Sequence, residues 1–394
     1  MDVARLCSAL VAIKSENPPG DTADVIEFIR DFLDARGIPS TVTDTGSGRC
    51  NLVTKNPKKP LLFCGHVDVV PAAQDGWTHP PYSGVIEDGW IWGRGATDMK
   101  GGCAAILSAC DSLVQEGRKL PADLAFVCDE EAGGDHGIRH LIRENMLSPC
   151  DCLIAEPTPT RHPCIGQKGL CRFTVNFAGM PGHGSLYPVV GVNAIMEAMG
   201  LLTYVNSLHD RKFPVNGDLK KLVEASAGVF SEEFHIPDGS RILERITFNP
   251  GVIEGGEKVN IIARHCSLGL EMRIPWGCSI PDLVGDIRRH APNGTVNVDT
   301  TSDPTLTDPT GDFTSIVCRE VERAWGGAVF PILQWAASDA RHLRRAGFNV
   351  IEYGPGELAT LHGIDERVSV ASLEKAVGIY RGILDAYSTG KKAP

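Results

Sequence analysis

Hydrophobic residues in the first 170 positions recur at two different spacings. Helical spacing predicts helices at the N-terminus, over residues 24–36 and over residues 103–116. Gly37 and Gly117 follow the last two of these segments, as glycine does at many helix C-termini. Continuous short apolar runs predict buried strands at residues 60–68, 124–129 and 152–156. The alternation of the two patterns is typical of a mostly parallel sheet flanked by helices.

The pattern changes near residue 171. Residues 171–178 alternate between apolar and polar side chains, which predicts a half-buried strand. Further elements are predicted as strands at residues 244–248, 266–274 and 296–299, and as helices at 193–207 and 281–290. Together these elements predict a compact α+β domain with one antiparallel sheet. Residues 209–241 follow neither pattern and give no prediction.

Alternation of helices and strands resumes at residue 308. Helices are predicted over residues 313–325 and 370–387, with a strand over 349–353 between them. The length of 394 residues also favours more than one hydrophobic core. The sequence therefore predicts an α/β catalytic domain, with a mostly parallel mixed sheet, formed by residues 1–170 and 304–394. An inserted α+β domain would comprise residues 171–303.

Composition narrows the choice of partners and location. Lysine and arginine number 38 against 49 aspartates and glutamates, so the net charge is −11, and no basic stripe is present. Nucleic acid is therefore not expected as a partner. No apolar run has the length of a membrane span, and acidic Asp2 stands where a signal peptide would be basic.

Thirteen cysteines without regular spacing are typical of a reducing cytoplasm rather than of a disulfide scaffold. One group that could be considered as a zinc site consists of Cys150, Cys152, Cys164 and Cys171. The spacing of this group matches no common zinc-binding pattern, and we interpret its members as buried thiols.

Acidic residues and histidines gather in five short motifs where strands are predicted to end. The motifs are Gly65-His66-Val67-Asp68, Thr97-Asp98-Met99-Lys100, Asp129-Glu130-Glu131, Ala155-Glu156-Pro157 and Leu361-His362-Gly363. Ligands of open α/β sheets collect beyond the carboxyl ends of the strands. Two imidazoles and several carboxylates make an N/O ligand set suited to a pair of zinc-like ions. The sequence therefore predicts a two-metal amide hydrolase.

Two of these motifs indicate roles for individual residues. His66 and Asp68 are two apart on a strand end, so both side chains point to one side and the carboxylate can orient the imidazole. Glu130 and Glu131 are adjacent, so one carboxylate can bind a metal while the other moves a proton. Taken alone, such a pair is more often two solvated acids at the start of a loop.

The strand-end motifs belong to longer segments that resemble the M20 metallopeptidase family. The resemblance covers nearly the whole chain and includes residues 65–71, 93–102, 129–131, 155–158, 191–195, 338–341 and His362. It implies a deacylase of the acetylornithine deacetylase or succinyl-diaminopimelate desuccinylase type, or a carboxypeptidase. It also implies two divalent metal ions, with zinc preferred and cobalt as the alternative.

The resemblance implies a role for each matching residue. The metal ligands it implies are Asp98 as the bridge, His66 and Glu156 on one ion, and Glu131 and His362 on the other. Glu130 would be the general acid/base, and Asp68 would be the partner of His66. The peptide bond that follows the bridging residue, between Asp98 and Met99, would be cis.

The same resemblance identifies the inserted domain with a lid that also mediates dimerisation. His183 would reach the active site of the partner subunit and stabilise an oxyanion. Arg273 and Asn260 would bind the substrate carboxylate, a task that suits the planar guanidinium. From the residues alone, His183 could instead be a turn residue facing solvent, and Arg273 could belong to an ordinary strand-end salt bridge.

The expected function is hydrolysis of an N-acyl-amino acid to a carboxylate and a free amine by a cytoplasmic homodimer, without a membrane or nucleic-acid partner. A metallo-carboxypeptidase is the alternative within the family. A metal-binding protein without turnover is an alternative from another class. Glu130 argues against it, because binding alone would not need that acid. A lidless aminopeptidase relative is disfavoured by the inserted domain.

Overall fold

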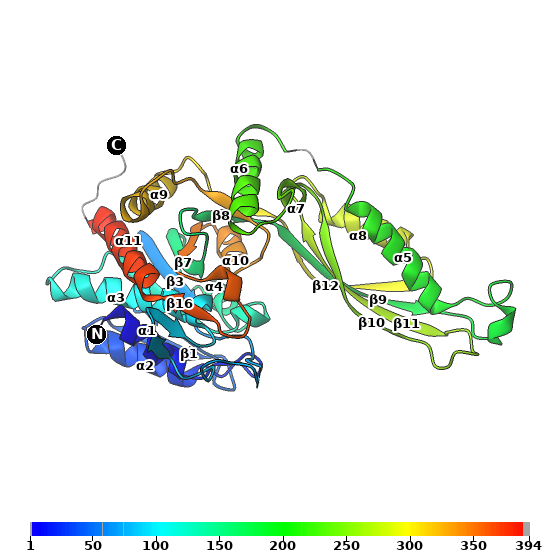
Figure 1. Ribbon diagram of the computed structural model, residues 1–394, viewed down its shortest axis with the longest axis horizontal. Helices are drawn as coiled ribbons and strands as arrows, with labels where there is room; N and C mark the ends of the chain where they lie inside the picture. The colour runs from blue at the N-terminus through cyan, green and yellow to red at the C-terminus, as the bar shows by residue number, and fades with distance from the viewer. Residues whose placement is uncertain (1, 57, 74, 214, 389–394) are drawn as a thin grey trace. The chain divides into compact units, whose positions relative to one another are not determined.

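We describe the protein from a computed structural model (Figure 1). The structure describes residues 2–56, 58–73, 75–213 and 215–388. Met1, at the start of the predicted N-terminal helix, and residues 389–394, at the end of the predicted catalytic domain, lie outside the described residues. The chain divides into two compact units. The first comprises Met1–Ile165, Leu306–Pro331 and Ser338–Pro394, and the second comprises Gly166–Thr305 and Ile332–Ala337.

The first unit is a sheet flanked by helices. Its helices are α1 Val3–Ala12, α2 Ala23–Asp34, α3 Gly101–Gln115, α4 Ile138–Arg143, α9 Asp312–Trp325, α10 Ala340–Arg345 and α11 Val370–Ser388. The strands of its main sheet, in spatial order, are β1 Ser40–Asp44, β2 Cys50–Thr54, β6 Ala122–Val127, β3 Leu61–His66, β7 Asp151–Pro157, β15 Asn349–Gly354, β8 Cys164–Gln167 and β13 Thr305–Leu306. A small sheet has the order β16 Arg367–Ser369, β5 Trp90–Trp92 and β4 Val85–Glu87. None of the described helices is long and apolar enough to cross a membrane.

The centre of the main sheet is parallel. Strand β3 pairs in parallel with β6 and β7, and β7 pairs in parallel with β15, whereas β1, β2 and β6 pair antiparallel. Strands β3 and β6 are buried along their whole length, as their continuous apolar runs predict. The predicted α/β class with a mostly parallel mixed sheet is thus confirmed.

Parallel pairing brings the carboxyl ends of β3, β6 and β7 to one edge of the sheet. The three predicted strand-end motifs that contain His66, Glu131 and Glu156 therefore share this edge. The start of helix α3 packs closely against this edge of the sheet. A Cβ atom on Gly102 would lie only 2.2 Å from the carbonyl oxygen of Ala155, so no larger residue fits there. The glycine allows the turn after Asp98 to approach the end of β7.

The second unit has one four-stranded antiparallel sheet, as predicted. In spatial order its strands are β10 Thr247–Gly255, β11 His265–Ile274, β9 Gly169–Ala178 and β12 Gly294–Ser302. The other elements are α5 Ala194–Leu208, α6 Gly217–Glu233, α7 Ser240–Glu244, α8 Ile280–Arg289 and β14 Ile332–Gln334. Alternate residues of β9, such as Phe173, Val175 and Phe177, join residues of α5 and α8 in the core.

Two parts of the second unit differ from the sequence predictions. The strand predicted at residues 244–248 is wrong at its start, because α7 ends at Glu244 and β10 begins at Thr247. The unassigned segment 209–241 contains α6, whose buried stripe is interrupted by Ser226. Ser226 is buried because its hydroxyl donates to the carbonyl of Leu222 at 2.6 Å and accepts the Leu333 N–H at 2.9 Å.

The segment Ile332–Ala337 also belongs to the second unit, although the sequence analysis places it in the catalytic domain. The ring of Trp335 packs edge-on against Phe230 of α6, with centroids 4.6 Å apart, and against Phe234 at 5.1 Å. These contacts explain the difference, because residues 209–241, which contain Phe230 and Phe234, follow no predictive pattern.

A buried lysine ties the segment between α7 and β10 to the start of β9. Lys168 is 1% exposed, and its ammonium group donates to the carbonyl of Ile242 at 2.6 Å and of Arg245 at 2.7 Å. A third bond reaches the hydroxyl of Thr247 at 3.1 Å. Burial lowers the pKa of Lys168 to about 7, but the three acceptors satisfy its donors.

Replacing Lys168 with Met should loosen residues 242–247. The substitution keeps the length of the side chain but leaves buried acceptors without a donor, which costs about 1–3 kcal/mol. Hydrogen exchange of the backbone amides in this segment should accelerate accordingly. Lys220→Met, on the exposed side of α6, is the matched control. Equal protection in the two variants would contradict this role of Lys168.

Candidate active site

The structure brings the five predicted metal ligands together in the first unit. The ligand atoms of His66, Asp98 and Glu156 all lie within 4.8 Å of one another. A second group with the same spread consists of Asp98, Glu131 and His362. Asp98 belongs to both groups, which is the arrangement that a bridging carboxylate requires.

Each carboxylate oxygen of Asp98 faces one imidazole. Its Oδ1 lies 3.0 Å from Nε2 of His66, and its Oδ2 lies 3.0 Å from Nε2 of His362. The other ring nitrogen of His66 donates to the backbone carbonyl of Asp68 at 2.9 Å, so in a neutral ring Nε2 carries a lone pair. Two lone pairs at 3.0 Å need a shared cation, which is a proton or a metal ion. The peptide bond between Asp98 and Met99 is cis, as the family resemblance implies.

The remaining carboxylates complete the two groups. Glu156 Oε1 lies 3.7 Å from Nε2 of His66, and Glu131 Oε1 lies 3.4 Å from Nε2 of His362. Glu131 Oε1 is also buried without a hydrogen-bond partner. Burial raises the pKa of both glutamates, with a further contribution from the charge of Asp98. A buried, unpartnered carboxylate oxygen among imidazoles fits a divalent cation.

The same concentration of negative charge raises the pKa values of the two imidazoles. Burial opposes protonation of His66, but the surrounding carboxylates, foremost Glu156, outweigh burial and raise its pKa well above the usual value. The hydrogen bond to Asp98, together with the nearby carboxylate of Glu131, raises the pKa of His362 to about 10. Without another cation the centre therefore holds protons, and a metal ion would displace them.

Asp68 lies beside His66, and its carboxylate also bonds the backbone of the following acidic motif. The carboxylate Oδ1 is 3.6 Å from Nδ1 of His66, which instead bonds the backbone carbonyl of Asp68. The carboxylate accepts the backbone N–H groups of Glu130 and Glu131, each at 3.2 Å. Asp68 therefore fixes the turn that separates the two glutamates.

Asn17 is a site residue that the sequence analysis missed. Its side-chain amide donates to the carboxylates of Asp68 at 2.9 Å and Asp129 at 3.1 Å, and Asn17 is 6% exposed. The Asp129 carboxylate also accepts the His136 N–H at 2.9 Å. The position of Asn17 before two prolines predicts only a turn, so no local pattern marks this residue.

Glu130 stands apart from both ligand groups. Its carboxylate contributes no atom to either of them, whereas the adjacent Glu131 does. Burial raises the pKa of Glu130 well above its usual value, and the charge of Asp339 adds to this effect. A carboxylate with a raised pKa is a stronger base and is suited to taking up and releasing a proton near neutral pH.

Two of the predicted residues of the second unit lie side by side. The N–H of Gly184, next to His183, donates to the carbonyl of Asn260 at 2.9 Å. Both His183 and Asn260 are exposed. Nδ1 of His183 lies 2.7 Å from the Ser185 hydroxyl and accepts the Ser185 N–H at 3.3 Å, so Nε2 carries the ring proton. His183 thus presents a free N–H donor.

Arg273 lies near the opposite end of the same sheet. Its Nη2 contacts Glu271 Oε1 at 2.6 Å, as in the ordinary salt bridge that the sequence left open. Its Nη1, however, is buried without a hydrogen-bond partner. Glu271 also accepts from Nε of Arg172 at 2.6 Å. The guanidinium group of Arg273 therefore keeps its Nη1 group available to donate to an anion.

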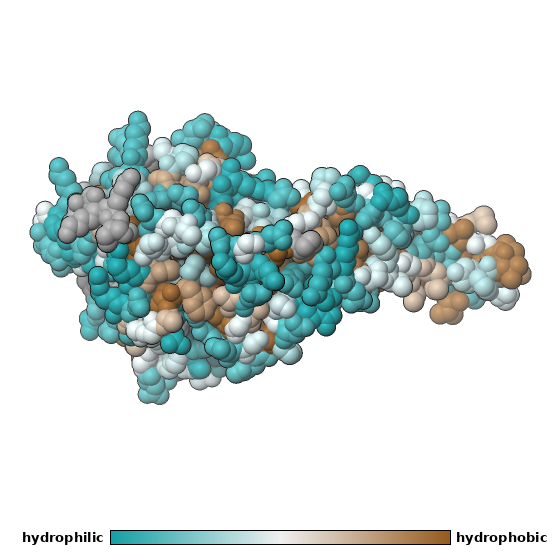
Figure 2. Space-filling view, turned by 90° about the horizontal axis from the view of Figure 1, so that it is seen from above, coloured by the Kyte–Doolittle hydropathy of each residue, from teal (hydrophilic) through white to brown (hydrophobic). Residues whose placement is uncertain are grey.

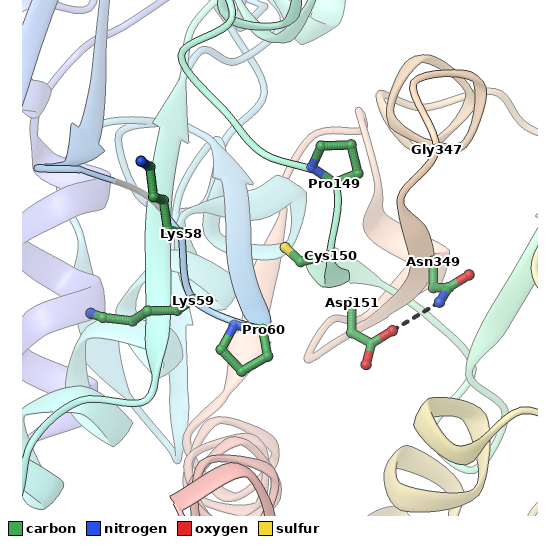
Figure 3. A pocket seen from close by; sticks show the side chains of 8 residues that line it. All are labelled: Lys58, Lys59, Pro60, Pro149, Cys150, Asp151, Gly347 and Asn349. Atoms are coloured by element: carbon green, nitrogen blue, oxygen red, sulfur yellow. Dashed lines mark hydrogen bonds between the residues drawn. The ribbon is translucent and has the colours of Figure 1, made fainter.

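One pocket of the first unit and the described cysteines lie outside both ligand groups. A pocket of about 450 Å³ lies at the amino ends of β3, β7 and β15, away from the metal ligands. Its Asp151 accepts from Asn349 at 3.0 Å and from Tyr387 at 2.5 Å, while Lys58 and Lys59 extend away from Asp151 (Figure 3). Among the described residues, no cysteine joins a group that could hold a metal.

Comparison with known proteins decides the family. The model of peptidase family M20/M25/M40 matches residues 62–386. A succinyl-diaminopimelate desuccinylase of Cereibacter sphaeroides is 32% identical over 415 residues, which cover 98% of this chain and 99% of that protein. The chain belongs to the M20 peptidase family. It is therefore a metal-dependent hydrolase.

Solved structures of the M20 family share the fold. An M20 metallo-carboxypeptidase of Sulfolobus solfataricus matches 99% of this chain and 100% of its own, with a TM-score of 0.81 and 17% identity. A dinuclear metal-binding M20 peptidase of Bacillus subtilis matches 97% and 96%, with a TM-score of 0.65 and 12% identity. At these identities the likeness confirms the fold, including the inserted domain, and no more.

Alanine variants of the ligands should separate the two metal sites of this M20 protein. His66→Ala and His362→Ala should each leave one tightly bound ion per chain, since each histidine belongs to only one ligand group. Asp98→Ala should reduce the affinity for both ions. Elemental analysis after equilibration in a buffer of fixed free zinc measures the stoichiometry, with exposed His290→Ala as control. Two ions retained by Asp98→Ala would contradict a bridging role.

Proposed function

We propose that the protein hydrolyses the amide bond of an N-acyl-amino acid, as a deacylase of the succinyl-diaminopimelate desuccinylase or acetylornithine deacetylase type. The products would be a carboxylate and a free amine. The observation that carries the proposal is the division between Glu131, within a ligand group, and Glu130, outside both groups. The desuccinylase relative, which aligns over nearly its whole length, supports the choice of substrate class.

Two divalent ions would be held by the two ligand groups, one by His66 and Glu156 and the other by Glu131 and His362, and Asp98 would contribute to both. Nitrogen and carboxylate ligands favour zinc, with cobalt as the alternative. Ions bound there supply Lewis acidity at the amide carbonyl and make water more acidic.

The proton transfers are assigned to Glu130. Its carboxylate takes a proton from the attacking water and passes this proton to the amide nitrogen as the C–N bond breaks. Burial raises the pKa of Glu130 and so favours the protonated side chain that forms between the two proton transfers. Asp68 holds the backbone of Glu130 and Glu131 through two N–H bonds, which keeps the acid and the ligand apart.

Replacing Glu130 with Gln should abolish most turnover but leave the metal content unchanged. General acid/base catalysis contributes about 10²–10⁴-fold to such reactions, and kcat should fall by that factor. The assay is amine release from N-succinyl- and N-acetyl-amino acids and from dipeptides, with exposed Glu144→Gln as control. Preference for dipeptides would favour the metallo-carboxypeptidase alternative, and unchanged turnover in Glu130→Gln would contradict the mechanism.

We further propose that the protein acts as a homodimer. In the second unit, Arg273 sits near the end of β11, whereas Asn260 lies in the loop before its start at His265. The strand from His265 to Arg273 alone spans about 27 Å, at about 3.4 Å per residue. A small N-acyl-amino acid does not bridge that distance. Hence Arg273 and the pair formed by His183 and Asn260 would serve different active sites.

Exposed apolar residues surround the pair formed by His183 and Asn260. Val189 is 90% exposed and Val259 is 107% exposed, and Met180, Leu186 and Ile261 are also exposed. Figure 2 shows hydrophobic surface gathered at the end of the second unit. Clusters of this kind are typical of surfaces that a partner covers. This supports a dimer in which His183 and Asn260 act in the partner's active site, separate from the site that Arg273 serves.

A heterodimer with two different lesions tests this arrangement. One chain would carry Glu130→Ala and the other His183→Ala, with different tags for purification. If His183 acts in the partner's site, one of the two sites keeps both groups, and the heterodimer should show about half of the wild-type activity. The homodimer of each variant should be nearly inactive.

A second heterodimer controls for subunit mixing. Glu130→Ala paired with Asp98→Ala places a lesion of the first unit in each chain, so neither site is intact and no activity should return. An inactive heterodimer of Glu130→Ala with His183→Ala, or a fully active monomer by light scattering, would contradict the proposed role of His183.

A further inference from the structure

A buried glutamate organises the turn that carries Asp98. Glu366 is 0% exposed. One of its carboxylate oxygens, Oε1, accepts the backbone N–H groups of Gly95, Thr97 and Asp98, each at 3.0 Å. Three converging donors on one oxygen fix the path of the backbone through residues 95–98. The turn that presents the bridging carboxylate is therefore built around a side chain from the far end of the sequence.

The second oxygen of the same carboxylate pairs with a buried arginine. Oε2 of Glu366 accepts from Nη1 of Arg94, which is 3% exposed. The Nη2 group of Arg94 donates to the backbone carbonyl of His362 at 3.0 Å. The imidazole of His362 is 44% exposed, so packing alone does not hold its loop. Arg94 thus links the His362 loop to the Asp98 turn.

Stability alone is a weak explanation for this ion pair. Removing two charges from water costs free energy that their attraction often fails to recover, and apolar residues of similar volume can serve as well. Here Arg94 and Glu366 form their other hydrogen bonds with backbone groups around the proposed ligands Asp98 and His362. Residues that bond the surroundings of metal ligands, without touching the metal, commonly tune its binding.

We propose that Arg94 and Glu366 are positioning residues that hold Asp98 and His362 in register for metal binding. The proposal rests on the metal centre proposed above, and it gives a role to two residues that coordinate no ion themselves. Glu366 fixes the Asp98 turn, and Arg94 transmits that position to His362. Thr97 strengthens the link, because its hydroxyl donates to the carbonyl of Arg367 at 2.7 Å.

The two ions should depend on this pair unequally. His66 and Glu156 lie at the carboxyl ends of the adjacent parallel strands β3 and β7, where Cys64 pairs with Ile154, so the sheet itself holds them. Glu131 and His362 come from loops, and the His362 loop is bonded by Arg94. Loss of the Arg94 link should therefore weaken the ion on Glu131 and His362 more than the ion on His66 and Glu156.

Three variants separate the contributions. Arg94→Lys retains a positive charge for Glu366 but loses the forked second donor to His362. Arg94→Met removes both interactions. Glu366→Gln keeps an oxygen for the three backbone N–H groups and loses the charge that pairs with Arg94. Exposed Arg5→Met and Glu374→Gln are matched controls that alter charge away from the site.

Competition with a chromophoric zinc chelator measures the affinity of each ion, independently of activity. The affinity of one ion should fall about 10- to 100-fold in Arg94→Lys and in Glu366→Gln, while the other ion stays within a few-fold of wild type. Hydrogen exchange of residues 361–366 should accelerate in Arg94→Lys. Arg94→Lys is the conservative variant that tests the proposal if Arg94→Met does not fold.

Wild-type affinity for both ions in Arg94→Lys and Glu366→Gln would overturn the positioning role. Equal loss of both ions in every variant would overturn the selective link to His362. If wild-type protein holds fewer than two ions, the proposed metal centre itself fails, which the zinc titration of the wild type reveals before any variant is compared.

Discussion

Concentrated negative charge around Asp98 is the constraint on which the rest of the structure depends. Each oxygen of Asp98 faces an imidazole at 3.0 Å, and Glu131 and Glu156 approach the same imidazoles within 4 Å. Buried carboxylates repel one another unless cations lie between them. The folded chain accordingly holds protons at this centre or exchanges them for metal ions. The chemistry proposed for the protein follows from that exchange.

The fold brings these groups together by two different means. Parallel pairing of β3, β6 and β7 delivers His66, Glu131 and Glu156 to one edge of the sheet. Asp98 and His362 lie on turns outside the sheet. Glu366 bonds the turn of Asp98, and Arg94 bonds the backbone of His362. The sheet therefore positions three of the five ligands, and a buried ion pair orders the turns that carry the other two.

This division explains what the sequence could predict. Strand-end ligands are predictable because a buried apolar run followed by polar residues marks both the strand and its carboxyl end. The family resemblance supplied Asp98, His362 and the cis bond. The pairing of Arg94 with Glu366 escaped prediction, because Arg94 lies in the matching segment 93–102 whereas Glu366 is 272 residues away and lies in no local pattern. Helix α6 escaped because Ser226 interrupts its apolar stripe and makes its hydrogen bond to Leu333, far along the chain.

The spacing of residues in the sequence also does not determine the hydrogen-bond partners of individual carboxylates. The spacing of His66 and Asp68 predicts that the carboxylate orients the ring. In the structure the backbone carbonyl of Asp68 bonds Nδ1 of His66, and the carboxylate, 3.6 Å from that nitrogen, also holds Glu130 and Glu131. Asn17 joins the same network from the first turn after α1. Which acceptor a donor chooses depends on backbone geometry that side-chain spacing does not specify.

Anomalous diffraction at the zinc edge from crystals equilibrated with zinc would test the central claim most directly. The account predicts two peaks about 3.5–4 Å apart, one on each side of the Asp98 carboxylate. One peak should lie within bonding distance of His66 and Glu156 and the other of Glu131 and His362, while Glu130 coordinates neither. A single peak, or a peak bound by Glu130, would contradict it.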